Sequence, residues 1–224
     1  MAIFSANVPK LVKYSPFKYV FKLELDHVLS ADVFHFWSPI DFALITFVLS
    51  PNTWSSSSLN TYLNGTYLTS LGTIKNKIAT TTWKAGGGSW DNIVNSVPKT
   101  AYQNEVGSSA SSTTVDKKIG LMYVSDYYYS ASPSAWTLVG YNGSDATKDY
   151  RAATSTNWLY LGSYEWTISR YSGNTNFAFN VNSTGYVEDS GVTNSFAVRP
   201  SFNLESSVKY VSGSGTIENP IRIN

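Results

Sequence analysis

The residues that most often do chemistry in proteins occur in this chain without a spacing that joins them into a site. The two histidines, His27 and His35, lie among Asp26, Asp32 and Asp41. Metal ligands from one segment usually recur at short, characteristic intervals, and these five residues match no such motif. We therefore predict that this segment holds no metal ion and no acid–base pair.

Three other patterns each lack a part that catalysis would need. Glu188 and Asp189 are neighbours on a predicted strand, so their carboxylates point to opposite faces and do not form a glycosidase pair. The many serines lack a G-x-S-x-G turn and a histidine in a recognisable partner position. The glycines Gly86 to Gly88 lack the lysine and hydroxyl of a phosphate-binding loop, which predicts a flexible loop. We expect no enzymatic activity and no cofactor.

Two arginines and a glutamate allow a functional and a structural interpretation. Arg170 and Arg199 lie on predicted central strands near Glu165, and a guanidinium binds a carboxylate or phosphate in bidentate geometry. The arginines could therefore bind an anion, but we favour a partly buried Arg–Glu network that ties the last two strands together. Two tryptophans could stack on a sugar, although aromatic residues at strand spacing are more typical of a core. The predicted framework residues are Trp158, Glu165, Trp166, Arg170, Arg199 and Pro200.

The polar run from Tyr171 to Asn194 is the best candidate for a binding surface. Tyrosine offers amphipathic contact area at low entropic cost, and asparagine offers adaptable hydrogen bonding. The alternative is that this run forms polar strand faces and turns that bind nothing. The predicted ligand contacts are Tyr171, Asn174, Asn176, Asn180, Asn182, Tyr186 and Asn194, with Tyr127 to Tyr129 as further candidates.

The composition narrows the possible partners. The net charge of +1 lacks the basic excess with which nucleic-acid-binding proteins neutralise phosphates. The absence of cysteine excludes disulfides, thiolate nucleophiles and cysteine-based zinc sites. The most apolar run, residues 33–49, is shorter than the roughly 20 residues that span a bilayer. We expect no nucleic-acid partner and no transmembrane span, and lysines interrupt residues 1–26 too often for an export signal.

Alternating apolar and polar residues predict several β-strands. Charged residues form 14% of the chain against about 25% in an average domain, while aromatic residues reach 15%. This balance is typical of strands with polar, uncharged outer faces. The predicted strands cover residues 17–25, 42–49, 119–129, 165–170, 177–181, 186–187 and 195–202, with an edge strand near the C-terminus.

Helical spacing occurs in one region. Serine N-caps after Trp54, followed by Leu59, Tyr62 and Leu63, predict a short helix that stops at Asn64-Gly65. A second amphipathic helix is predicted over residues 67–78. Residues 84–118 have loop composition on both sides of a segment, 93–106, whose structure the pattern does not decide.

Several motifs and the order in which they occur resemble those of one bacterial family. The motifs are W-x-x-S-S-L-N-x-Y-L-N-G-x-Y-L from Trp54, IGLMYVSDY, EWTISR, F-x-V-x-x-x-G-x-V from Phe179, and AVRPSF. They resemble uncharacterised domains of gut Firmicutes surface and secreted proteins, which are similar to formylglycine-generating enzymes and the Fibrobacter major paralogous domain. The resemblance implies an α+β, C-type-lectin-like domain over residues 42–224, with two short helices packed on twisted antiparallel strands and long loops. Residues 1–41 then form an atypical N-terminal extension with one strand.

The resemblance implies binding rather than catalysis. Enzymes of that branch use paired cysteines, which this chain lacks. Calcium-dependent lectins carry a Glu-Pro-Asn or Gln-Pro-Asp loop before a Trp-Asn-Asp motif, an order that this chain does not follow. We expect a non-enzymatic recognition module of a bacterial cell-surface or secreted protein, with a glycan or protein ligand. The alternative is a structural spacer or phage-like adhesion scaffold without a small-molecule ligand, and the oligomeric state stays open.

Overall fold

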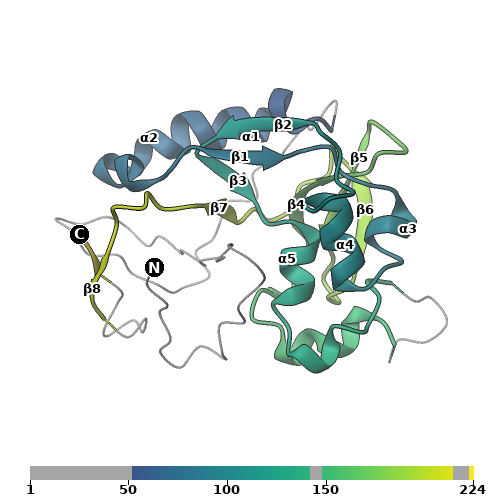
Figure 1. The fold of residues 1–224 in the computed structure, drawn as a ribbon. Coiled ribbons are helices and arrows are strands. Elements are labelled where there is room, and N and C mark those ends of the chain that lie inside the picture. Colours follow the sequence, from purple (N-terminus) through teal and green to yellow (C-terminus); the bar gives the residue numbers. More distant parts are fainter. Residues whose placement is uncertain (1–51, 142–147, 214–221) are drawn as a thin grey trace.

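The computed structural model describes residues 52–141, 148–213 and 222–224 (Figure 1). The strands predicted over residues 17–25 and 42–49 lie outside the described residues, as does the predicted N-terminal extension. The described part combines short helices with antiparallel strands in several small sheets. The predicted α+β class is therefore confirmed.

The largest sheet is a three-stranded antiparallel sheet in which β5 lies between β4 and β6. Its strands are β4 (Glu165–Arg170), β5 (Phe177–Val181) and β6 (Val187–Gly191). β4 is buried along most of its length, whereas β6 is mostly half-buried. Directly opposed residues share a face of a sheet, so Phe179 and Asp189 lie side by side. The strands predicted over residues 165–170 and 177–181 are confirmed, whereas the one predicted over residues 186–187 shares only Val187 with β6.

Three two-stranded antiparallel ribbons accompany this sheet. Their strands are β1 (Thr81–Lys84) with β2 (Thr114–Lys117), β3 (Ile119–Leu121) with β7 (Pro200–Phe202), and β8 (Tyr210–Ser212) with β9 (Arg222–Ile223). The strand predicted over residues 195–202 is confirmed only from Pro200 onward. β2 lies where the sequence predicted a loop, because its pairing partner is distant in the sequence.

Residues 54–77 form one nearly continuous helical segment instead of two separate helices. The predicted stop at Asn64-Gly65 is wrong. Asn64 Oδ1 accepts the Ile119 N–H at 2.9 Å, and Asn64 Nδ2 donates to the Ile119 carbonyl at 2.8 Å, so the side chain pairs with β3 as a strand would. The segment contains α1 (Ser58–Tyr62), a π-helical turn (Leu63–Tyr67), α2 (Leu68–Ser70) and a 3-10 helix (Gly72–Lys77).

Three further helices occupy segments for which the sequence predicted a strand, a loop or nothing definite. They are α3 (Trp90–Ile93), α4 (Pro98–Glu105) and α5 (Val124–Tyr129), of which α4 and α5 pack together beside β4 (Figure 1). The strand predicted over residues 119–129 is therefore right only for β3. The chain turns into α5 because the Asp126 carboxylate accepts the N–H of Tyr123 at 2.9 Å, which satisfies a free donor at the helix start.

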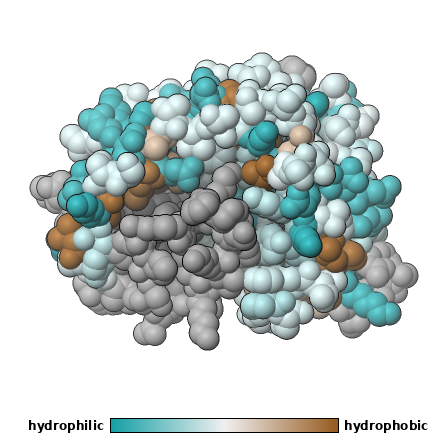
Figure 2. Space-filling view, viewed as in Figure 1, coloured by the Kyte–Doolittle hydropathy of each residue, from teal (hydrophilic) through white to brown (hydrophobic). Residues whose placement is uncertain are grey.

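Buried apolar residues form two clusters, one on each face of the β4–β5–β6 sheet. One cluster includes Trp166 and Ile168, and the other includes Phe179 together with Tyr127 and Tyr128. Because both tyrosines are fully buried, their prediction as further ligand contacts is wrong. On the face shown in Figure 2, most coloured residues are hydrophilic or of intermediate hydropathy, and the hydrophobic ones form small separate groups.

A buried carboxylate joins α4 to the start of α5. Glu105 is 3% exposed, and its two carboxylate oxygens accept the N–H groups of Val124 at 3.0 Å and Ser125 at 2.8 Å. The Ser169 hydroxyl on β4 also donates to Glu105. Burial raises the pKa of Glu105 to about 7. Hydrogen bonds from Ser125 and Ser169 act in the opposite direction but are the smaller effect.

This pKa predicts a pH dependence of stability. Between about 4.5 and about 7 the folded protein holds a proton on Glu105 that the unfolded chain has lost. The free energy of unfolding should therefore fall as pH rises through this range, by at most about 1.4 kcal/mol per pH unit from this group. Urea denaturation at several pH values measures the slope. Glu105→Gln should remove it and Glu205→Gln, at an exposed position, should keep it; an unchanged slope in Glu105→Gln would contradict this origin.

Candidate functional site

Two of the predicted ligand contacts are buried inside the protein. Asn180 is 0% exposed on β5, and Asn182 is 3% exposed just after it. Asn182 Oδ1 accepts the N–H groups of Thr184 at 2.8 Å and Gly185 at 3.1 Å, so this side chain shapes the turn between β5 and β6. The prediction that Asn180 and Asn182 contact a ligand at the surface is therefore wrong.

Three other predicted contacts lie together on exposed turns at the opposite end of the sheet. Asn174 and Asn176 belong to the turn before β5, and Asn194 belongs to the turn after β6. The two turns adjoin, because the Val192 N–H donates to the Asn176 carbonyl at 2.9 Å. Asn174 Oδ1 accepts the Asn176 N–H at 2.9 Å, and Asn52 Nδ2 donates to the Asn174 carbonyl at 2.9 Å. These hydrogen bonds hold the turn before β5 in its shape.

The remaining two predicted contacts, Tyr171 and Tyr186, are the ends of a chain of aromatic rings that we call the aromatic row. Tyr171 lies 5.7 Å from Phe179 between ring centroids, and Phe179 lies 6.5 Å from Trp90. Trp90 in turn lies 5.9 Å from Tyr141, which lies 5.3 Å from Tyr186. Phe179 is fully buried and the other four residues are half-buried. The row therefore has one buried ring, Phe179, next to its Tyr171 end, and four partly exposed rings.

The three glycines before α3 place Trp90 in this row. Gly87 has a φ of 64°, and a Cβ there would lie 1.9 Å from the carbonyl oxygen of Arg170. Gly88 donates its N–H to that carbonyl at 3.1 Å and accepts the Ser172 N–H at 2.8 Å. Only glycine allows so close an approach of two backbones. The prediction of a flexible loop is corrected, because this segment is bonded to the end of β4.

A fixed ion pair borders the row at Tyr186. The guanidinium of Arg151 lies over the Tyr186 ring at 5.1 Å from its centroid. Arg151 Nε donates to Asp149 Oδ2 at 2.8 Å, and the carboxylate of Asp149 is fully buried. The guanidinium is therefore held in one place while about a third of its side chain, 31%, stays exposed.

Two carboxylates of β6 lie near different residues of the row. Asp189 is the direct cross-strand partner of Phe179, and burial raises the pKa of its carboxyl group. Glu188 pairs with the buried Asn180, so the neighbouring carboxylates lie on opposite faces of the strand. Burial raises the pKa of Tyr186, and the nearby Glu188 carboxylate raises it further. Acceptor groups thus lie beside Phe179 and beside Tyr186 at one end of the row.

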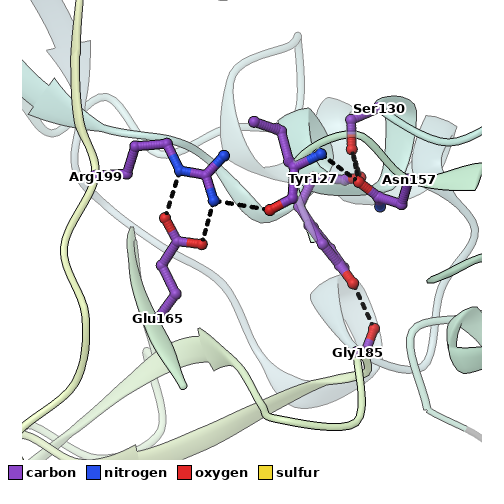
Figure 3. Close-up of polar contacts among 7 residues, drawn as sticks. Tyr127, Ser130, Asn157, Glu165, Gly185 and Arg199 are labelled. Atoms are coloured by element: carbon purple, nitrogen blue, oxygen red, sulfur yellow. Dashed lines mark hydrogen bonds and ion pairs between the residues drawn. The ribbon is translucent and has the colours of Figure 1, made fainter. Parts of the chain in front are cut away.

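The structure contains the predicted Arg–Glu pair, but only Arg199 takes part in it. Arg199 Nε and Nη2 each lie 2.9 Å from an oxygen of the Glu165 carboxylate, and Nη2 also donates to the Leu159 carbonyl at 2.8 Å (Figure 3). Arg199 is 5% exposed and Glu165 is 1% exposed. Arg170 lies outside this network, because its Nε donates to the Gly86 carbonyl at 2.9 Å.

Further hydrogen bonds extend this network to the turn that carries Tyr186. Asn157 Oδ1 accepts the Leu159 N–H at 2.9 Å, and Asn157 Nδ2 donates to the Tyr127 carbonyl at 2.9 Å. The Tyr127 hydroxyl donates to the Gly185 carbonyl at 2.7 Å (Figure 3). The ion pair is thus linked through α5 to the residue that precedes Tyr186.

The other framework residues have different degrees of burial. Trp166 is fully buried in the first cluster, and Pro200 is buried at the start of β7. Trp158 is half-buried at the edge of the second cluster. None of the three belongs to the aromatic row.

Sequence reasoning missed Trp90, Tyr141 and Arg151. They come from three segments with loop composition, and no local spacing connects them to Tyr171 and Tyr186. The only sequence signal for this part of the site was the run of glycines before Trp90. Such a run can indicate a close approach of two backbones as well as a loop. Long-range packing alone brings these side chains together.

The chain is an α+β domain with a partly exposed aromatic row, and it belongs to a family described as a domain of unknown function, DUF6273. The family's sequence profile matches residues 47–206. No curated protein and no solved structure gave a significant match. Among the helices of the described residues, none is long and apolar enough to cross a membrane. Within residues 52–141, 148–213 and 222–224, no three His, Asp or Glu side chains gather to hold a metal ion.

The buried ion pair predicts a large difference between the two arginines. Arg199→Ala leaves the Glu165 carboxylate buried without its partner and should lower the free energy of unfolding by about 3–5 kcal/mol. Arg170→Ala removes one hydrogen bond at a half-buried position and should cost about 1 kcal/mol. Equilibrium urea denaturation of both variants measures the difference, and equal losses would contradict the framework role of Arg199.

Proposed function

We propose that this domain is a non-enzymatic recognition module of a bacterial surface or secreted protein, with a glycan or protein ligand. The observation that carries the proposal is the aromatic row, whose four outer rings are half-buried beside Arg151 and the carboxylates of β6. Tyrosine and tryptophan provide large contact areas at low cost in conformational entropy. Polar groups at their border would fix the orientation of a ligand.

The proposal includes a C-type-lectin-like fold and an extracellular or cell-surface location. The ordered motifs from Trp54 to AVRPSF support both, because they resemble domains of gut Firmicutes surface and secreted proteins. The low share of charged residues in the chain, 14%, and its many serines and threonines are in keeping with this location.

The rival function is a spacer or adhesion scaffold that packs against a neighbouring domain. Leu161 and Tyr164 favour it, because they are 39% and 38% exposed and lie outside the aromatic row. Tyr164 stacks on Phe196 with ring centroids 4.8 Å apart. This group could be covered by another domain without any ligand.

A glycan and protein array tests the proposal against this rival. The wild-type domain should bind at least one class of ligand, and Tyr171→Ala combined with Tyr186→Ala should remove the binding by deleting both ends of the row. Tyr164→Ala is the matched control, since it removes a similar exposed ring elsewhere and should leave binding intact. Near-ultraviolet circular dichroism would establish that each variant is folded. Absence of any ligand, or loss of binding only in Tyr164→Ala, would overturn the proposal.

A further inference from the structure

The charges around the aromatic row restrict what can lie on it. The positive charge of Arg151 is already matched by the carboxylate of Asp149 at 2.8 Å. The carboxylates of Glu188 and Asp189 lie on β6 beside Tyr186 and Phe179. Ionised carboxylates only accept hydrogen bonds and repel other anions. A ligand of this surface must therefore supply hydrogen-bond donors without negative charge.

The row is also extended. Tyr171 precedes the turn before β5, and Tyr186 follows the turn after β5, so the row runs from one end of this strand to the other. A five-residue strand is roughly 15 Å long at about 3.3 Å per residue. That length suits several linked rings of a chain molecule better than one small ligand.

From these features we propose that the ligand is an uncharged oligosaccharide, which lies lengthwise along the aromatic row and binds without a metal ion. This inference rests on the proposed function and deepens it. The apolar C–H face of a pyranose ring carries small positive partial charges and packs on the negative face of an aromatic ring. Tyr171, Trp90, Tyr141 and Tyr186 supply such rings along the row, with the buried Phe179 between the first two.

The polar border supplies the hydrogen bonds that sugar hydroxyls need. The Asp189 carboxylate, next to Phe179, accepts from hydroxyl groups of a sugar ring that lies between Tyr171 and Trp90. Burial already raises the pKa of Asp189, so part of the desolvation that binding requires is present before the ligand arrives. Arg151 directs Nε and Nη2 to Asp149, and its other N–H groups can donate to sugar oxygens near Tyr186.

A basic peptide would offer donors to the same carboxylates, but one contact disfavours it. The guanidinium of Arg151 already lies 5.1 Å from the centre of the Tyr186 ring, where a ligand cation would otherwise bind. The guanidinium occupies that position, so a lysine or arginine of the ligand cannot make the same cation–π contact with Tyr186. An uncharged sugar does not need this contact.

Isothermal titration calorimetry on the full chain tests this inference. The probes are neutral hexasaccharides (β-glucan, xylan, mannan and N-acetylglucosamine chains), an oligogalacturonate and a lysine-rich peptide. At least one neutral hexasaccharide should bind, and its disaccharide should bind at least tenfold more weakly because it covers less of the row. The affinity should be the same with EDTA and at high salt. The oligogalacturonate should not bind.

Variants of the row locate the site. Trp90→Ala and Asp189→Asn should each weaken the binding of the neutral hexasaccharide about tenfold, which corresponds to 1.4 kcal/mol. Asp116→Asn is the matched control on β2 and should change nothing. Trp90→Phe, which keeps a ring, should recover part of the affinity and serves if Trp90→Ala does not fold. Binding that none of these variants changes would overturn the inference.

The outcomes separate this inference from the proposed function. Binding of the lysine-rich peptide alone, abolished by high salt, would overturn the oligosaccharide inference and leave a recognition module for proteins. Sugar binding that EDTA abolishes would overturn the metal-independent mode and keep the recognition function. Failure of every probe here and on the arrays would overturn both.

Discussion

β4 is buried along most of its length although four of its six residues are polar, and the rest of the fold depends on how these polar groups are satisfied. Glu165 forms an ion pair with Arg199, and the Thr167 hydroxyl donates to the Phe179 carbonyl at 2.7 Å. Ser169 donates to Glu105. The partners come from the segment before β7, from β5 and from α4, so one strand fixes three elements. A buried polar group without a partner would be costly, which makes these pairings specific as well as stabilising.

The sequence predicts the elements that are determined locally and misses those that depend on distant partners. β4 and β5 were predictable, because alternating side chains and turn residues define them within a short segment, whereas only the first residue of β6 was predicted. The continuation of the first helix past Asn64-Gly65 was not, because the Asn64 side chain bonds to Ile119 on another strand. The sequence predicts a strand that starts at Ile119 and gives no signal for α5, because the Glu105 carboxylate that accepts the first N–H groups of this helix lies about twenty residues earlier.

The candidate site was predictable only at its two ends. Tyr171 and Tyr186 lie in the run that composition marks as a recognition surface, yet the asparagines between them are buried or shape turns. Polar residues in a strand usually indicate a face that is exposed to solvent. Asn180 is fully buried, so other parts of the protein cover the polar face of β5. Trp90 reaches the row through a glycine segment bonded to the end of β4, a contact that no local pattern encodes.

We propose that the framework centred on β4 positions a separate recognition surface, the aromatic row. Resolved NMR signals of the tryptophan indole N–H groups test this separation during titration with a bound neutral hexasaccharide. The Trp90 indole signal should shift strongly with saturation, while those of the buried Trp166 and Trp54 should stay in place. Binding that leaves the Trp90 signal unchanged, or that shifts all three signals alike, would contradict the assignment of the aromatic row as the recognition surface.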